Sequence, residues 1–308
     1  MKEPPPVRAT LTQLRTFEAV ARLGGVGRAA QALHLAQPTV STQLKELAAA
    51  VGLQLFTPVG RRLALTPEGD LLLARTRELF AVWRQFEDDA AALRGLARGQ
   101  LRVSAVTTAE YFLPELIGPF AQAHPGIDIE LAVENRAAVV QRLARGDDEL
   151  AVMMLPPDEL PLQRWPFLEN PLVVVAPAAH PLARRRTALR LAQLVHEPRL
   201  TREAGSGTRA ATDRFLAEHG VNWPPRMALG SNEALKHAVL AGLGLAVLSR
   251  HTLGPAPERT GLVELRVTGF PIRRMWHFVW RHDRRLTRPA QAFLDDLRRR
   301  LAPRQSAA

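Results

Sequence analysis

A heptad of apolar residues is the feature that most constrains how this chain folds. Between Pro67 and Arg94, apolar side chains recur every seventh residue, and Trp83 falls four residues after the second of them. A 3.5-residue period over four heptads predicts one long helix, about 40 Å in length, that pairs with a second copy. The alternative is one amphipathic helix packed on its own domain. Because charged residues are many and a second apolar stripe is lacking, we favour dimerisation, through Leu72, Leu79, Trp83, Phe86 and Leu93.

The ends of this helix divide the chain. Thr66 and Pro67 suit an N-cap and a first helical position, and Gly95 suits a helix end. A linker helix over residues 66–95 therefore separates residues 1–65 from residues 100–303. A length of 308 residues is sufficient for such an arrangement of two or three domains.

Composition narrows the class of protein. The chain has no cysteine, which excludes disulfides and thiol chemistry, and its formal net charge is +11. The excess lies at the two ends: residues 1–65 carry 8 basic and 3 acidic side chains, and residues 273–308 carry 10 and 3. Net charge alone is weak support for nucleic-acid binding. Without a recognisable leader or an apolar run of about 18 residues, we expect a cytoplasmic protein that does not enter the membrane.

The sequence predicts three helices within the first 51 residues. Apolar spacing predicts a first helix capped by Thr12 and ending at Gly24-Gly25, a second from Arg28 to Leu33, and a third over residues 37–51. A tight turn over residues 34–36 joins the last two. Two short helices joined in this way fit the major groove of DNA when the second has a polar outer face.

The third helix has that polar face. Its amide and hydroxyl side chains are suited to base edges and its lysine to a phosphate or a guanine edge, and these residues are Gln37, Pro38, Thr39, Ser41, Thr42 and Lys45. Residues 56–65 predict a hairpin with a basic tip, where Arg61 and Arg62 contact the DNA backbone. The alternative is an ordinary three-helix bundle with a solvated face.

The N-terminal motifs closely resemble those of the LysR-type transcription regulators. The resemblance rests on the run from Gln37 to Leu47, on Leu55-Phe56, on Gly60-Arg61-Arg62, and on residues 65–69 (Leu-Thr-Pro-Glu-Gly). It implies a winged helix-turn-helix that binds double-stranded promoter DNA, with Arg28 among the contacting residues, and a homodimer that assembles into a homotetramer. The family often has Ser before the second helix, whereas this chain has glycines, which predicts a weaker cap.

Residues 101–301 alternate strand and helix patterns, which is typical of an α/β fold. Strands are predicted at 101–106, 127–133, 150–155, 172–176, 241–248, 262–267 and 275–280. Helices are predicted at 113–123 and 136–145, in a segment that opens over residues 202–209 and continues to 219, from about 231, and at 288–301. The order resembles the two-lobed, periplasmic-binding-protein-like effector domain of the LysR family. That resemblance implies lobe I at about 100–167 and 268–303, and lobe II at about 168–267.

Three segments place small polar residues at helix starts. They begin near Thr107, Arg202 and Ser231, with Thr208 as the expected cap of the second, and free N–H groups at such starts bind anions. Simple capping is the alternative for each. If they meet in one cleft, the effector-binding residues are Thr107, Thr108, Met153, Arg202, Glu203, Ser206, Gly207, Thr208, Asn232 and Glu233.

These segments look most like the LysR subgroup that regulates carbon-dioxide fixation (RuBisCO) operons. The resemblance implies an activator whose effector is a small anionic metabolite, of the phosphorylated sugar, phosphoenolpyruvate or NADPH class. The chain has Glu110 where that subgroup is expected to have Lys, which argues against a phosphate contact there. Regulators of sulfur assimilation or aromatic catabolism are the alternative within the family.

The sequence argues against an enzyme. It contains no Walker motif, no Gly-x-Ser-x-Gly elbow and no His-Glu-x-x-His, so we expect no catalytic residue, no metal site and no cofactor. A solute-binding protein or an enzyme with a two-lobed α/β fold is the alternative from another class. It leaves the first 95 residues unexplained.

Overall fold

The computed structural model describes residues 8–59, 62–93, 99–185, 187–254 and 260–305. Contacts between Cα atoms divide the chain into two compact units, residues 1–87 and 88–308. The boundary falls within the long helix α4 (Pro67–Leu93), which begins in the first unit. The division into residues 1–65, 66–95 and 100–303 stays a prediction.

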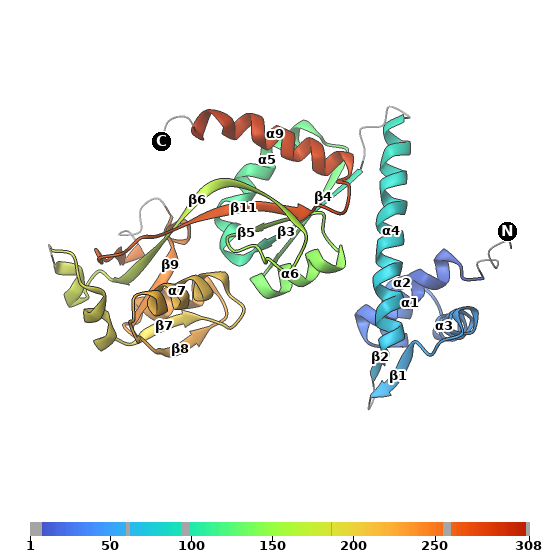
Figure 1. The fold of residues 1–308 in the computed structure, drawn as a ribbon, viewed down its shortest axis with the longest axis horizontal. Coiled ribbons are helices and arrows are strands. Elements are labelled where there is room, and N and C mark those ends of the chain that lie inside the picture. Colours follow the sequence, from blue (N-terminus) through green and yellow to red (C-terminus); the bar gives the residue numbers. More distant parts are fainter. Residues whose placement is uncertain (1–7, 60–61, 94–98, 186, 255–259, 306–308) are drawn as a thin grey trace. The chain divides into compact units, whose positions relative to one another are not determined.

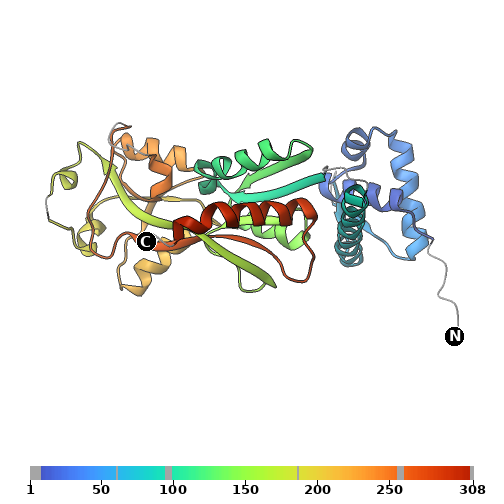
Figure 2. The same ribbon diagram turned by 90° about the horizontal axis from the view of Figure 1, so that it is seen from above.

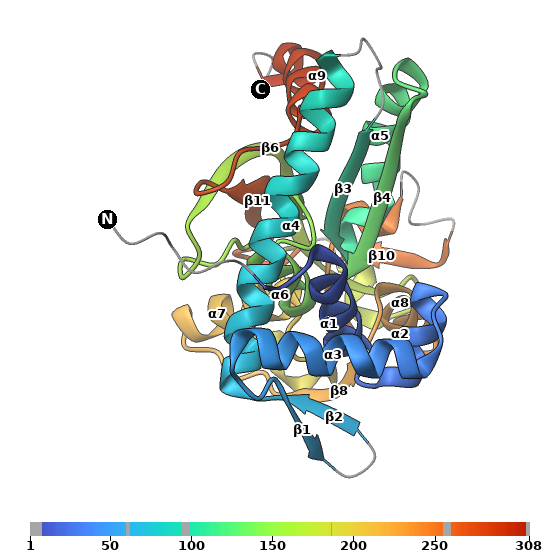
Figure 3. The same ribbon diagram turned by 90° about the vertical axis from the view of Figure 1, so that its right-hand side faces the viewer.

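The first unit is a three-helix cluster followed by a hairpin (Figure 3). It contains α1 (Leu11–Leu23), α2 (Val26–Leu33), α3 (Gln37–Val51), and the antiparallel strands β1 (Phe56–Val59) and β2 (Arg62–Leu65). The side chains of Phe17, Val20, Val40 and Leu47 are fully buried between the helices. The predicted helix-turn-helix is therefore confirmed.

Two helix starts differ from the prediction. Thr10 rather than Thr12 is the N-cap of α1, because Thr10 and Gln13 form a capping box in which each side chain bonds the other's backbone N–H. Helix α2 begins at Val26, two residues before the predicted Arg28, and its N-cap Gly25 makes no side-chain hydrogen bond. The glycines thus leave the weaker cap that the sequence predicted, without loss of the helix.

Gly69 allows the start of α4 to lie close to the backbone of Leu55, directly before strand β1. The carbonyl oxygen of Leu55 accepts from the N–H of Thr66, and a Cβ added at Gly69 would lie 2.2 Å from that oxygen. The hydroxyl of Thr66 caps α4 by accepting from Gly69 N at 3.0 Å. Only glycine fits this approach without moving the backbone.

Gly69→Ala should therefore destabilise the first unit by about 1–3 kcal/mol, because the added methyl group forces the helix away from the hairpin. Hydrogen exchange measured by mass spectrometry should show faster exchange in peptides from residues 8–59. The control is Gly118→Ala in the second unit's helix α5 (Leu113–Ala123), where the added Cβ meets no atom within 4 Å. Unchanged exchange in both variants would contradict the steric argument.

The second unit is built on one sheet of nine strands in the order β4-β3-β5-β11-β6-β9-β7-β8, with β10 also paired to β6. Strands β6 and β11 run side by side through the middle of this unit (Figure 1). Two long antiparallel strands, β6 and β11, join a sheet region containing β3, β4 and β5 to one containing β7, β8 and β9. The strands are β3 (Gly99–Val106), β4 (Ile127–Glu134), β5 (Leu150–Met153), β6 (Leu162–Pro177), β7 (Arg199–Arg202), β8 (Pro225–Leu229), β9 (Leu245–Ser249), β10 (Leu262–Glu264) and β11 (Ile272–Arg281).

Helices cover both regions of this sheet. In lobe I these are α5 (Leu113–Ala123), α6 (Arg136–Arg145) and α9 (Arg288–Gln305), and in lobe II they are α7 (Gly207–Glu218) and α8 (Asn232–Leu240). Helices α5 and α9 meet through Phe120 and Phe293, whose ring centroids are 5.1 Å apart. Seen from above, α9 (dark red) runs along the sheet (Figure 2). Short 3-10 turns complete the unit, among them η1 (Thr107–Tyr111) directly after β3.

Strand alternation sets which helix packs on which face of lobe II. Val173 and Val175 belong to one apolar cluster with Leu235 and Val239 of α8. Val174 and Ala176, which alternate with these two valines along β6, belong to a second apolar cluster that includes Ala211 and Phe215 of α7. Because successive side chains of a strand point to opposite faces, α7 and α8 cover opposite sides of β6.

Several strand predictions were wrong in extent. Strand β6 begins ten residues before the predicted Leu172, because its first half is mostly exposed or half-buried and lacks a continuous apolar run. Strand β9 begins only at Leu245, since residues 241–244 form a turn. The short strands β7 and β8 were not predicted. Within the described residues, no helix is both long and apolar enough to cross a bilayer.

Candidate functional site

The outer face of α3 carries the predicted DNA-contacting residues. The side chains of Gln37, Pro38, Thr39, Thr42 and Lys45 are exposed, and Ser41 is half-buried. Helical spacing aligns three of these residues in one row, because positions 38, 42 and 45 lie on the same side of a helix. Arg28 on α2 is exposed as well. The tip of the hairpin, with Arg61 and the side chain of Arg62, lies outside the described residues.

A second surface lies on α4. Leu79, Val82, Trp83 and Phe86 are between 44% and 72% exposed, and together with Leu11 they line one open apolar depression. The rings of Trp83 and Phe86 are 5.6 Å apart, and the Trp83 indole N–H donates to Glu87. Positions 79, 82, 83 and 86 form one helical stripe. We call these four residues of α4, together with Leu11 of α1, the apolar stripe of α4.

Leu72, another residue of the predicted dimer seam, packs within its own unit. Its side chain packs against the core of the first unit beside Leu73, which is only 8% exposed, so Leu72 does not extend the apolar stripe. The start of α4 lies against the hairpin there, and the unit partly covers the side chain of Leu72. Val82 and Leu11 belong to the apolar stripe but were not predicted, although the i+3 spacing of Val82 from Leu79 is visible in the sequence. The side chain of Leu93 lies outside the described residues.

In the second unit, a small cavity opens between lobe I and lobe II. It measures about 20 Å³, which is space for one water molecule. Residues from both lobes line it: Val106, Thr107, Thr108, Asn135, Arg136, Met154, Arg202, Ser206, Gly207, Thr208 and Trp276. Two of the three predicted segments therefore contribute to its wall directly, and the third contacts them through Asn232.

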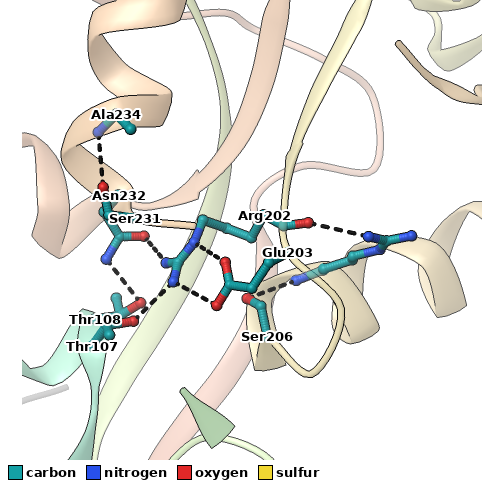
Figure 4. A network of polar contacts seen from close by, with 9 residues as sticks. Thr107, Thr108, Arg202, Glu203, Ser206, Ser231, Asn232 and Ala234 are labelled. Carbon is teal, nitrogen blue, oxygen red and sulfur yellow. Dashed lines mark hydrogen bonds and ion pairs between the residues drawn. The ribbon is translucent and has the colours of Figure 1, made fainter. Parts of the chain in front are cut away.

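Arg202 is the centre of a polar network in this wall (Figure 4). Its Nε and Nη2 donate to the two carboxylate oxygens of Glu203, at 2.8 and 3.1 Å. Nη2 also donates to the hydroxyl of Thr107 in lobe I at 3.1 Å, and Nη1 donates to the side-chain oxygen of Asn232. The amide nitrogen of Asn232 in turn donates to Thr108 at 3.3 Å. The network thus joins β7 and α8 of lobe II to η1 of lobe I.

Ser206 caps α7 at this wall. Its hydroxyl accepts from Arg209 N, whereas Thr208, the predicted cap, already lies within the helix. Gly205 adopts a left-handed φ of 87°, and a Cβ added there would lie 3.1 Å from the Cβ of Ala137. The Gly-Ser-Gly sequence therefore forms a turn that lets α7 begin close to α6 of the other lobe.

Arg136 is a cleft residue that the sequence analysis missed. It occupies the first position of α6, whose N-cap Asn135 accepts from Ala138 N at 3.0 Å. Its Nε donates to the carbonyl oxygen of Leu155 at 2.6 Å, and among the described residues its two terminal nitrogens have no hydrogen-bond partner. Arg136 therefore presents an available cation beside the N-termini of α6 and α7. An arginine following an asparagine at a predicted helix start was the available signal.

Trp276 also lines the cavity and was missed. It is 1% exposed, and its indole N–H has no hydrogen-bond partner in the described part of the chain. Met153, which was predicted to contact the effector, is fully buried in β5. The next residue, Met154, lines the cavity instead, because successive residues along an extended chain face opposite sides.

At the edge of the cleft, a second contact joins the lobes. The phenol of Tyr111 in η1 donates to Glu233 Oε1 at 2.5 Å, and Lys236 Nζ lies 2.7 Å from the same carboxylate. Burial, together with the hydrogen bond to Glu233, raises the pKa of Tyr111 and so favours the protonated phenol that donates this bond. Glu233 thus contacts the other lobe and does not line the cavity itself.

An exposed polar helix in a helix-turn-helix unit, joined by a long helix to a two-lobed α/β unit with a cationic cleft, defines a DNA-binding regulator with a small-molecule sensor. The chain belongs to the LysR family. Residues 11–70 match the bacterial regulatory helix-turn-helix proteins of the lysR family, and residues 94–302 match the LysR substrate binding domain.

Several relatives are regulators of known name. The chain is 43% identical to the RuBisCO operon transcriptional regulator of Allochromatium vinosum, over 93% of this chain and 95% of the relative. It is 40% identical to the HTH-type transcriptional activator CmpR of Synechocystis sp., over 94% and 95%. These relatives are transcriptional regulators. In this chain, no cluster of His, Asp and Glu suited to a metal ion occurs among the described residues.

Solved structures agree with the fold. The regulatory domain of CcmR from Synechocystis PCC6803, determined in complex with 2-PG, is 40% identical, with a TM-score of 0.64 over 66% of this chain and 98% of that domain. Full-length CbnR in a complex with its target DNA has a TM-score of 0.66 at 21% identity, over 94% of this chain and 99% of CbnR. The second comparison shows the shared fold alone.

Proposed function

We propose that this protein regulates the transcription of carbon-dioxide fixation genes, binding their promoter through α3 and sensing a phosphorylated carboxylate in the interlobe cleft. The arrangement of Arg136 beside the N-termini of α6 and α7 carries the proposal, since it suits a small anion. The complex of the related CcmR domain with 2-PG, which is 2-phosphoglycolate, supports that ligand class. The named RuBisCO operon regulators support the target genes.

Ligand binding in the cleft would change the position of the two lobes relative to each other. Arg136 belongs to lobe I and Ser206 to lobe II, so one anion held by both contributes binding energy to a particular lobe arrangement. A cavity of about 20 Å³ admits a multi-atom anion only after side chains or lobes move. Binding and rearrangement are therefore coupled, and the ligand needs no chemical change.

The test is promoter binding measured by fluorescence anisotropy and footprinting, with and without 2-phosphoglycolate. We expect specific binding upstream of the ribulose-bisphosphate carboxylase operon of the same genome, and a changed footprint when 2-phosphoglycolate is added. A footprint that does not respond over a wide concentration range would contradict the proposed effector. Equal affinity for that promoter and for random DNA would contradict the proposed target.

Substitutions on α3 should separate sequence reading from electrostatic attraction. Lys45→Ala should weaken binding to all DNA sequences and reduce the salt slope by about one, because one phosphate contact is lost. Thr42→Ala should reduce discrimination between operator and random DNA with little change in that slope. Arg75→Ala on α4 removes the same charge as Lys45→Ala at an exposed position and serves as the control. Identical behaviour of all three variants at every salt concentration would rule out α3 as the reading helix.

A further inference from the structure

Arg202 has little bonding capacity left for a ligand. A guanidinium has five N–H donors, and four of those of Arg202 bond Glu203, Thr107 and Asn232. Its side chain is 1% exposed, so the charge lies away from water and depends on the Glu203 carboxylate for neutralisation. An anion that enters the cleft therefore meets an Arg202 whose charge is already compensated.

Glu203 is held much less firmly than Arg202. Its side chain is 25% exposed, and the hydrogen bonds of its carboxylate in the described residues all come from the Arg202 guanidinium. Its main chain is fixed, because its N–H donates to Leu229 O at 3.0 Å and its carbonyl accepts from Ser206 N at 3.3 Å. Rotation of the side chain alone is therefore sufficient to carry the carboxylate into water.

We propose that Glu203 is a built-in competitor for the effector: its carboxylate neutralises Arg202 until a carboxylate or phosphate group of the ligand takes its place. A buried arginine stays paired in both states, which a simple exchange of anions achieves. Arg202 lines the same cavity as Arg136. The ligand would therefore bind both arginines: Arg136, whose terminal nitrogens are available, and Arg202, from which it must displace Glu203. This inference rests on the proposed function, in which the cleft binds an anion.

The exchange has a consequence for affinity. Each molecule of ligand must displace the negatively charged Glu203 carboxylate from Arg202, so Glu203 raises the ligand concentration needed to occupy the cleft. Glu203→Gln keeps the size and one acceptor oxygen but removes the negative charge. It should bind 2-phosphoglycolate about tenfold more tightly than the natural protein.

Isothermal titration calorimetry of the full chain with 2-phosphoglycolate tests this expectation. Glu134→Gln is the matched control: it removes one exposed carboxylate at the end of β4, for which the described residues show no hydrogen bond. The control should bind like the natural protein, because its carboxylate does not contact Arg202. Thermal melting of each variant verifies that it is folded.

The outcomes separate this inference from the proposed function. If the natural protein does not bind 2-phosphoglycolate, the proposed effector is wrong and the exchange has no basis. If it binds and Glu203→Gln binds equally or more weakly, only the exchange is wrong. A crystal structure of the natural protein with 2-phosphoglycolate provides a second measurement that needs no variant. Retention of both Glu203 hydrogen bonds to Arg202 in that complex would overturn the inference.

Discussion

Phe86→Asp should separate the protein into monomers and lower its affinity for a promoter with two half-sites about a hundredfold. Phe86 is 60% exposed in the apolar stripe of α4, next to Trp83. If the stripe packs against a second copy, the substitution buries a carboxylate among apolar side chains, which is strongly unfavourable. Loss of the dimer makes the binding of the two half-sites independent, so the gain from linkage disappears.

Sedimentation velocity and anisotropy with intact and single half-site DNA measure both effects. Ala74→Asp introduces the same charge at an exposed position on a different face of α4 and is the control. Phe86→Asp should bind a single half-site as the natural protein does, since α3 is unchanged. An unchanged sedimentation coefficient for folded Phe86→Asp would show that the apolar stripe does not hold the dimer together.

Arg136→Met should lower the affinity for 2-phosphoglycolate about a hundredfold, because truncating one partner of a desolvated charged pair typically has an effect of this size. Arg136 presents two terminal nitrogens to the cleft, and the described residues show no acceptor for them. Methionine fills most of the same volume without the charge. Arg136→Lys retains the charge but loses the planar fork, so it should have an intermediate affinity.

The matched control is Arg145→Met, which removes an exposed arginine from the last turn of the same helix. Calorimetry with 2-phosphoglycolate gives the affinities, and anisotropy with promoter DNA should show unchanged binding in the absence of ligand. If Arg136→Met is folded and binds 2-phosphoglycolate like the natural protein, the anion does not use α6. The site would then have to be built from the residues of lobe II.

Local signals predicted most helix boundaries. The predicted helices over residues 113–123 and 136–145 agree with α5 and α6, and the predicted start near Ser231 agrees with α8, whose N-cap is that residue. A cap depends on a few neighbouring residues, so the sequence contains the information. Strand extents were less predictable, since β6 owes its first half to pairing with β11, more than a hundred residues later.

In the cleft, too, some residues were predictable from local sequence signals and others were revealed only by the tertiary structure. Thr107, Thr108, Arg202 and Asn232 were identified as polar residues at helix starts, and the structure brings them into one network. Arg136 was overlooked because a basic residue at an ordinary helix start is common, and only its position opposite α7 makes it a cleft residue. The predicted contact of Glu203 with the effector stays a prediction, and the structure adds that Glu203 pairs with Arg202.

The heptad pattern from which the long helix was predicted illustrates what each level determines. The sequence by itself determined that residues 67–93 are helical and that one side is apolar, because both depend on spacing along the chain. Only the tertiary structure decided that Leu72 packs within its own unit while Val82 stays exposed. Periodicity specifies a face of a helix, but which part of that face remains uncovered depends on what the rest of the chain packs against it.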